Sequence, residues 1–236
     1  LMISKHKFDY FLQTISTRYP NLQTELNFST PFQLLIAVML SAQTTDKQVN
    51  RVTKKLFDSV HTPQDIVALW FENMRKHIAS INYYNNKAKN IWKTSELLNN
   101  QTYQNKILSS ISNKHARKLY NKRWYVLPDT LENMIELPWV WIKTAKVVWV
   151  ILFDWPYIAV DTHIHRVANR LWIVQTTNPN TTSEQLENIL SKNQSKTAHH
   201  NMILFGRYFC TARNPRCHEC PFRSFCKYFK SQNIQS

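Results

Sequence analysis

Two residues past the middle of the chain carry side chains that could do covalent chemistry together. Lys143 stands at the start of a short apolar stretch, and Asp161 follows it eighteen residues later. A lysine amine attacks electrophilic carbon only when it is neutral, a form that burial and a helix N-terminus favour. A carboxylate beside it can exchange protons with the amine. The simpler alternatives are a surface phosphate contact for Lys143 and a helix N-cap for Asp161.

Four cysteines gather near the end of the chain and are its whole cysteine content: Cys210, Cys217, Cys220 and Cys226, spaced C-x6-C-x2-C-x5-C. In a chain that we expect to be intracellular, such a cluster favours metal binding over disulfides. Four thiolates suit a tetrahedral zinc ion or an iron–sulfur cluster, and the residue types alone leave both open. Five basic residues surround them, so we expect an ordered loop suited to phosphates: Arg207, Arg213, Arg216, Arg223 and Lys227.

Short helices must position the lysine and the aspartate. Apolar residues at Ala145, Val148 and Ile151 predict a buried helix that begins at about Lys143. The Leu-Pro pair at 137–138 indicates a turn after a helix over residues 129–136, and Asp-Trp-Pro at 154–156 forces another turn. A third helix is expected over residues 163–171, so Lys143 and Asp161 each stand at a helix start.

The rest of the chain also favours helices. We expect one within residues 1–25, one over 31–42 with proline at its start, and one capped by Thr45 or Asp46. Three short helices are expected within residues 62–98 and one over 183–190. Residues 99–123 are polar and basic, and indicate a solvated insertion or a helix hairpin. Strand patterns are scarce, so the predicted class is all-α.

Charge and hydropathy limit the partners. Lysine plus arginine outnumber aspartate plus glutamate by 30 to 15, a formal charge of +15. Such a charge predicts a polyanionic partner, although an AT-rich genome would also enrich lysine and asparagine. No run of eighteen apolar residues is present and the first residues do not resemble a signal peptide, so we expect no membrane partner.

Several stretches together resemble the endonuclease III family. The family's hairpin and Lys-Thr-Ala pattern is found in LPWVWIKTA at residues 137–145, and Val-Asp-Thr-His at 160–163 keeps the eighteen-residue spacing. The segments ELNFSTPFQLLIAVMLSAQTTDKQVN and NKAKNI and the cysteine spacing extend the resemblance over nearly the whole chain. It implies a two-lobed, all-α helix-hairpin-helix DNA glycosylase fold with a C-terminal 4Fe–4S cluster loop.

The resemblance implies a bifunctional DNA glycosylase and abasic-site lyase of base excision repair. Lys143 would attack C1′ of an extruded nucleotide, expel the base and form a Schiff base, which permits β-elimination of the 3′ phosphate. Asp161 would stabilise positive charge at the sugar and exchange protons. The implied partner is double-stranded DNA that contains oxidised pyrimidines or abasic sites, and the implied ligands of the cluster are the four cysteines.

Further DNA contacts follow from the same resemblance. Gln43 would enter the stack where the damaged base has left, and Tyr83 would act as a wedge, although core packing is the alternative for Tyr83. Asn82 stands where the family has glycine, and asparagine tolerates the left-handed turn expected there. His163 would line the catalytic pocket. Backbone N–H groups of the hairpin would bind a phosphate at Trp139, Val140 and Trp141.

The hairpin contains an anomaly of composition. The chain has one glycine, Gly206, where average usage of about 7% gives roughly sixteen. Tryptophans stand at family glycine positions: Trp139, Trp141, Trp172, Trp70, Trp124 and Trp155. We hypothesise that UGA codons read as glycine by the organism are printed here as tryptophan. If Trp139 and Trp141 are genuine, the alternative is a catalytically impaired DNA-binding iron–sulfur protein, or a structural iron–sulfur protein that uses its basic face elsewhere.

Two lobes are expected. Residues 25–155 would form a six-helix domain with the hairpin, and residues 1–24 with 156–236 would form the iron–sulfur domain. The chemistry would take place where Lys143 and Asp161 meet, between the lobes. We expect a monomeric bacterial protein of the cytoplasm, associated with the nucleoid.

Overall fold

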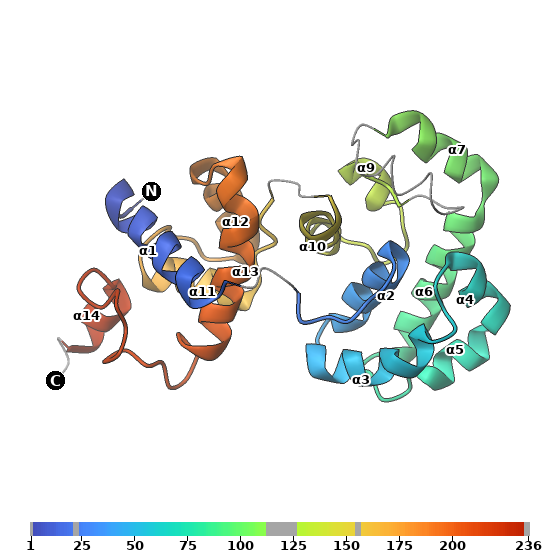
Figure 1. Cartoon of the computed structure of the whole chain (residues 1–236), viewed down its shortest axis with the longest axis horizontal. Helices are drawn as coiled ribbons and strands as arrows, with labels where there is room; N and C mark the ends of the chain where they lie inside the picture. Colours follow the sequence, from blue (N-terminus) through green and yellow to red (C-terminus); the bar gives the residue numbers. More distant parts are fainter. Residues whose placement is uncertain (1, 21–23, 112–126, 154–156, 234–236) are drawn as a thin grey trace. The chain divides into compact units, whose positions relative to one another are not determined.

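The computed structural model describes residues 2–20, 24–111, 127–153 and 157–233 (Figure 1). Within these ranges every regular element is a helix, which confirms the predicted all-α class. None of the helices in these ranges is long and apolar enough to cross a membrane.

The chain divides by its internal contacts into two units. Residues 24–153 form one, called here the hairpin unit, and residues 1–23 with 154–236 form the other, called the cluster unit. The sequence predicts a DNA-binding hairpin in the first unit and an iron–sulfur site in the second.

The hairpin unit is built around a helix that is buried on all sides. α2 (Pro31–Ser41) begins with proline after Thr30, whose hydroxyl accepts a hydrogen bond from the Gln33 N–H, and its residues 32–40 are all buried. Pro31 suits a helix start because the first N–H of a helix has no partner inside the helix. The buried Gln33 side chain donates to the carbonyls of Phe57 and Val60, so its polar amide is satisfied inside the core.

The described part of the hairpin unit holds seven helices besides α2. They are α3 (Asp46–Phe57), α4 (Pro63–Leu69), α5 (Phe71–His77), α6 (Tyr84–Asn99), α7 (Gln101–Ser110), α9 (Leu131–Met134) and α10 (Ile142–Leu152). α2 packs against α3, α6 and α10. Side-chain caps start α3 at Thr45 and α4 at Thr62, as the sequence predicts for the first of them.

The cluster unit has an aromatic core under the cysteine loop. Its helices are α1 (Lys5–Arg18), α11 (Thr162–Arg170), α12 (Pro179–Ile189), α13 (Lys192–Tyr208) and α14 (Lys227–Asn233). Phe11, Phe205 and Phe222 meet edge to face, with ring centroids 5.0–6.0 Å apart. α11 and α13 cross at Gly206, where a Cβ atom would lie 2.8 Å from the Cβ of His163. The chain's one glycine is therefore required by close helix packing.

Three sequence expectations need correction. The helix expected over residues 129–136 is only the single turn of α9, and the helix expected over 183–190 begins four residues earlier, at Pro179, because Asn178 caps it. Residues 101–110 are not a solvated insertion: α7 buries Tyr103 and Ile107, and the Tyr103 hydroxyl donates to the Asn133 carbonyl at 2.7 Å. Burial, and next the charge of Glu136, raise the pKa of Tyr103. Most of the remaining insertion lies outside the described residues.

Candidate active site and iron–sulfur loop

The hairpin before Lys143 is a tight turn with a strained residue. The Val140 N–H donates to the Leu137 carbonyl at 3.0 Å, which closes a four-residue turn with Pro138 second and Trp139 third. Trp139 has φ 63°, the left-handed value that a type II turn requires at its third position and that glycine normally supplies. The Thr94 hydroxyl of α6 donates to the Pro138 carbonyl at 3.1 Å and so fixes the turn to the unit.

Lys143 lies in the first turn of α10, directly after this hairpin. Trp141 is the N-cap, makes no side-chain capping bond, and is exposed, as are Ile142 and Lys143. The first N–H groups of a helix have no partner within it, and its N-terminus carries partial positive charge. This helix end also contains no acidic residue, so its N–H groups suit an anion. The hairpin unit by itself does not bury Lys143, and its placement at a helix start is the one predicted.

Asp161 is the N-cap of α11, the structural role that its position favours. Its Oδ1 atom accepts from the N–H groups of His163 and Ile164 at 2.9 and 2.8 Å. Both bonds use one oxygen, and among the described residues the other oxygen, Oδ2, accepts no hydrogen bond. Capping fixes the orientation of the carboxylate and leaves Oδ2 for chemistry. Asp161 belongs to the cluster unit and Lys143 to the hairpin unit.

His163 is held within the cluster unit. Its Nδ1 atom lies 3.2 Å from Nη2 of Arg166, and its Cβ packs over Gly206. Arg166 in turn donates to the carbonyls of Gly206 and Cys210. Burial is the main cause that lowers the pKa of Arg166, although the neighbouring Cys210 raises it. This placement gives His163 a packing role, and a role in the catalytic pocket stays a prediction.

Gln43 and Tyr83 stand on two neighbouring loops of the hairpin unit. Gln43 is exposed with φ 56°, and Tyr83 is the N-cap of α6 with φ 58°. Tyr83 is 61% exposed, so it is not a core residue. The expectation that Asn82 carries the left-handed turn is wrong, because the next residue, Tyr83, takes that conformation. Asn82 instead donates its side-chain amide to the Gln43 carbonyl at 2.8 Å and joins the two loops.

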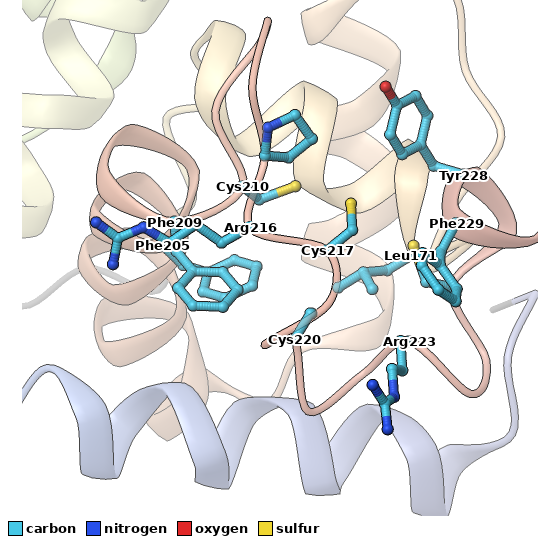
Figure 2. Close-up of a pocket in the computed structure, with 12 residues that line it drawn as sticks. Leu171, Phe205, Phe209, Cys210, Arg216, Cys217, Cys220, Arg223, Tyr228 and Phe229 are labelled. Atoms are coloured by element: carbon cyan, nitrogen blue, oxygen red, sulfur yellow. The ribbon is translucent and has the colours of Figure 1, made fainter. Parts of the chain in front are cut away.

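The four cysteines line one cavity in the cluster unit. Leu171, Phe205, Phe209 and Phe229 supply apolar walls, and Arg216 and Arg223 lie at the same loop. Figure 2 shows Cys210, Cys217 and Cys220 along this loop, with the rings of Phe205 and Phe209 beside it. Among the described residues no three His, Cys, Asp or Glu side chains are grouped as ligands of a single metal ion. The cysteines are unpaired thiols around a shared apolar space.

Burial disfavours the thiolate form of three of these cysteines. It is the first cause that raises the pKa of Cys217 and Cys226, and it raises the pKa of Cys220 to about 11, with further contributions from the neighbouring thiols. Metal ligation requires thiolates, so the positive charge of bound iron must compensate both burial and mutual repulsion. The residues therefore fit an iron–sulfur group, because they supply four thiols and none of them is in a disulfide.

Arg170 supports the cysteine loop in a way that the sequence did not indicate. Its guanidinium donates to the carbonyls of Thr211 and Ala212 at 2.7 and 2.9 Å and lies 3.5 Å from the Cys210 sulfur. It also stacks on Tyr228, 4.0 Å from the ring centroid. Of the basic residues expected to bind phosphates, Arg213, Arg216, Arg223 and Lys227 are exposed and Arg207 is half-buried.

Lys87 is a second residue that sequence reasoning missed. It is 3% exposed and donates to three oxygens at the end of α2 and in the loop that carries Gln43. Lysine is normally a surface residue, so its type argued against burial. The only sequence feature that pointed to Lys87 is its position in the NKAKNI segment, which supports the family resemblance but does not indicate burial.

Two family models match the chain. Residues 36–192 match the HhH-GPD superfamily of base excision DNA repair proteins, and residues 210–226 match the iron–sulfur binding domain of endonuclease III. The second match decides between the two metal sites that the residues left open. The chain carries an iron–sulfur binding domain.

Relatives and solved structures agree over nearly the full length. Endonuclease III of Rickettsia conorii is 40% identical over 217 residues, which cover 92% of this chain and 93% of that protein. Endonuclease III of Escherichia coli strain K12 is 38% identical over 232 residues, covering 98% and 100%. A structure of a trapped endonuclease III–DNA covalent intermediate matches with TM-score 0.82 and 36% identity, covering 98% of this chain and 100% of that one. The chain belongs to the endonuclease III family of HhH-GPD base excision repair glycosylases.

Proposed function

We propose that this protein is a bifunctional DNA glycosylase and abasic-site lyase that uses Lys143 as its nucleophile. The observation that carries the proposal is the position of Lys143: exposed, in the first turn of α10, beside N–H groups that suit a phosphate. It is supported by the 36% identical endonuclease III that has been trapped as a covalent intermediate with DNA. Oxidised pyrimidines and abasic sites in duplex DNA are the proposed substrates.

The proposed reaction breaks three bonds in turn. The neutral Lys143 amine attacks C1′ of an extruded nucleotide, the bond from C1′ to the base breaks, and the base leaves with the electron pair and a proton. The bond from C1′ to the ring oxygen then breaks, the oxygen takes up a proton as the C4′ hydroxyl, and the Lys143 nitrogen and C1′ form an imine. The imine withdraws electrons, so a proton is lost from C2′ and the bond from C3′ to the phosphate oxygen breaks. Asp161 would stabilise the developing positive charge and carry protons through Oδ2, since Oδ1 is occupied by the cap.

Other residues would hold the DNA. The N–H groups of the hairpin and of the first turn of α10 would bind a phosphate, Gln43 would fill the gap left by the nucleotide, and Tyr83 would wedge the stack. Exposed arginines of the cysteine loop would add phosphate contacts. Cys210, Cys217, Cys220 and Cys226 would hold the iron–sulfur group, which would link four points of that loop. We propose a monomer that acts on the bacterial chromosome.

Borohydride trapping tests the proposal directly. Borohydride reduces the imine to a stable amine, so incubation with an abasic duplex is expected to give a covalent protein–DNA adduct. Lys143→Ala should remove the adduct, and Lys146→Ala, which removes a lysine from the same helix one turn later, should keep it. An adduct that survives Lys143→Ala, with its peptide mapping to another amine, would assign the nucleophile elsewhere.

One observation favours the alternative of an impaired DNA-binding protein. Trp141 is 71% exposed at the N-cap of α10, where its indole would stand in the path of a phosphate. If this controls function, the protein binds duplex DNA with strong salt dependence but forms no adduct. In that case the Trp141→Gly variant should form the covalent adduct that the parent protein does not form. If the first proposal is right, the parent protein already forms the adduct.

A further inference from the structure

A buried lysine holds the loop that carries Gln43. Lys87 Nζ donates to the carbonyls of Leu40 and Ala42 at 2.7 and 2.6 Å and to the Thr44 hydroxyl at 3.2 Å. A lysine ammonium has three donors and no acceptor, so these three oxygens satisfy it completely. The loop residue between the last two partners is Gln43, whose backbone is left-handed.

Charge explains why this position holds lysine. The last carbonyls of a helix have no partner within the helix and carry its partial negative charge. Leu40 lies in the last turn of α2 and Ala42 is its C-cap, so the ammonium compensates that helix end. Burial lowers the pKa of Lys87 to about 8, which leaves the side chain largely protonated at neutral pH with all three donors in place.

Two more contacts reach the Tyr83 loop, one from the Gln43 loop and one from Gln48 in the first turn of α3. Asn82 donates its amide to the Gln43 carbonyl at 2.8 Å, and the Gln48 amide donates to the Ser80 hydroxyl at 2.9 Å. A left-handed conformation costs about 1–2 kcal/mol for a residue other than glycine, so it persists only where neighbours impose it. At Gln43 those neighbours are Asn82 and Lys87.

The same helix also holds the hairpin. Lys87 and Thr94 are both buried on α6, seven residues apart and hence on one face, about 10 Å along the axis. Thr94 binds the Pro138 carbonyl, and Tyr83 caps the start of the helix. One face of α6 therefore fixes the Gln43 loop at one end and the hairpin further along, which sets the spacing between them.

We propose that Lys87 is a positioning residue that, with Asn82, holds the Gln43 loop in its left-handed conformation so that Gln43 is ready to fill the gap left by an extruded nucleotide. The inference rests on the proposed function only for the role of Gln43. It makes the preference for damaged DNA depend on a side chain that is too buried to touch DNA.

The test measures binding to a duplex that contains a tetrahydrofuran abasic analogue, which cannot form an imine, and to the same duplex undamaged. Lys87→Met should reduce the preference for the analogue about tenfold and leave the affinity for undamaged duplex unchanged, because phosphate contacts remain. Lys89→Met removes an exposed charge from the same helix and should leave the preference as it is. Asn82 is exposed, so Asn82→Ala is not expected to affect folding. Like Lys87→Met, it should lower the preference for the analogue over the undamaged duplex.

A double-mutant cycle separates positioning from general destabilisation. If Lys87 acts through Gln43, Lys87→Met adds no further loss of preference in a Gln43→Ala background, whereas two independent effects would add. Additive losses, or an unchanged preference in both Lys87→Met and Asn82→Ala, would overturn the inference. Borohydride trapping of the parent protein on an abasic duplex is measured in parallel. If no adduct forms but the effects of Lys87→Met and Gln43→Ala are not additive, catalysis by Lys143 is refuted and the positioning role of Lys87 is retained.

Discussion

Replacing Trp70 by glycine is expected to stabilise this protein, which is unusual for the loss of a large aromatic side chain. Trp70 joins α4 to α5 with φ 65° and ψ 142°, a backbone region that is almost confined to glycine. Its side chain is 75% exposed, so little buried area is lost on truncation. Relief of about 1–3 kcal/mol of strain exceeds the roughly 0.5–1 kcal/mol that glycine's extra freedom in the unfolded chain costs.

Trp141→Gly is the matched control. Trp141 is 71% exposed but has φ −87°, an ordinary value, so its replacement relieves no strain and only the cost of glycine remains. We expect Trp70→Gly to raise the free energy of unfolding by about 1 kcal/mol and Trp141→Gly to lower it by about as much. For a chain of this size each corresponds to about 2–4 °C in the unfolding midpoint.

Circular dichroism at 222 nm is the suitable assay, because fluorescence changes when a tryptophan is removed. Urea unfolding of both variants beside the parent protein gives the two differences with opposite signs. Equal loss of stability in both would refute the argument that the backbone at residue 70 requires glycine. It would also weaken the hypothesis that several of these tryptophans are glycines in the native host, which a peptide mass across residues 137–146 tests independently.

Three further predictions concern single sites. Asp161→Ala should lower the free energy of unfolding by about 1 kcal/mol because the α11 cap is lost, whereas Asp161→Asn keeps a capping oxygen and should keep the stability. Both variants should lose trapping. Equal stability of the two variants in urea would argue against the cap. Removing iron with a chelator under oxidising conditions should speed hydrogen exchange across residues 210–226, because burial then opposes the unligated thiolates of Cys217, Cys220 and Cys226. Unchanged exchange would mean that the loop orders itself. The pKa of Lys87, about 8, lies below the usual lysine value, so the unfolded chain binds the extra proton between pH 8 and 10.5. The free energy of unfolding of the parent relative to Lys87→Met should therefore rise as pH increases through that window, and a difference that stays constant with pH would contradict the burial of a charged lysine.

Local chemistry made the helix starts predictable. Pro31 after Thr30, Thr45 before Asp46, and Asp161 before α11 each combine a capping oxygen or a fixed proline φ with an apolar stretch, and all lie where the pattern indicates. The sequence predicts a helix over residues 129–136, which is longer than α9, because this segment contains no residue that signals a helix end before Leu137. Its end depends on packing, which sequence periodicity does not contain.

Tertiary burial of polar residues was not predictable. α13 buries His199, His200 and Asn201 in its middle, so the sequence of this long helix lacks a clean apolar stripe, and no helix was expected there. Lys87 shows the same limit, since only the fold brings the end of α2 to meet it. Asn82 and Tyr83 show the limit at single-residue scale: which of two adjacent residues becomes left-handed depends on the partner that one of them finds across the loop.

The residues with a left-handed backbone are of two kinds, which differ in whether neighbouring side chains hold that conformation. Five residues in the described ranges have positive φ and none is glycine: Gln43, Trp70, Tyr83, Trp139 and Trp172. At Gln43 the conformation is imposed by side-chain hydrogen bonds from Asn82 and Lys87, as expected where strain serves a site. At Trp172 the indole N–H is buried and has no partner among the described residues, which adds a cost of about 1–3 kcal/mol to the strain. A left-handed residue held by side-chain hydrogen bonds, such as Gln43, argues for the residue that is present, whereas a left-handed residue with an unsatisfied buried N–H, such as Trp172, argues for glycine. Trp139 shares the left-handed φ, at 63°, inside the proposed phosphate-binding hairpin, where a type II turn normally has glycine.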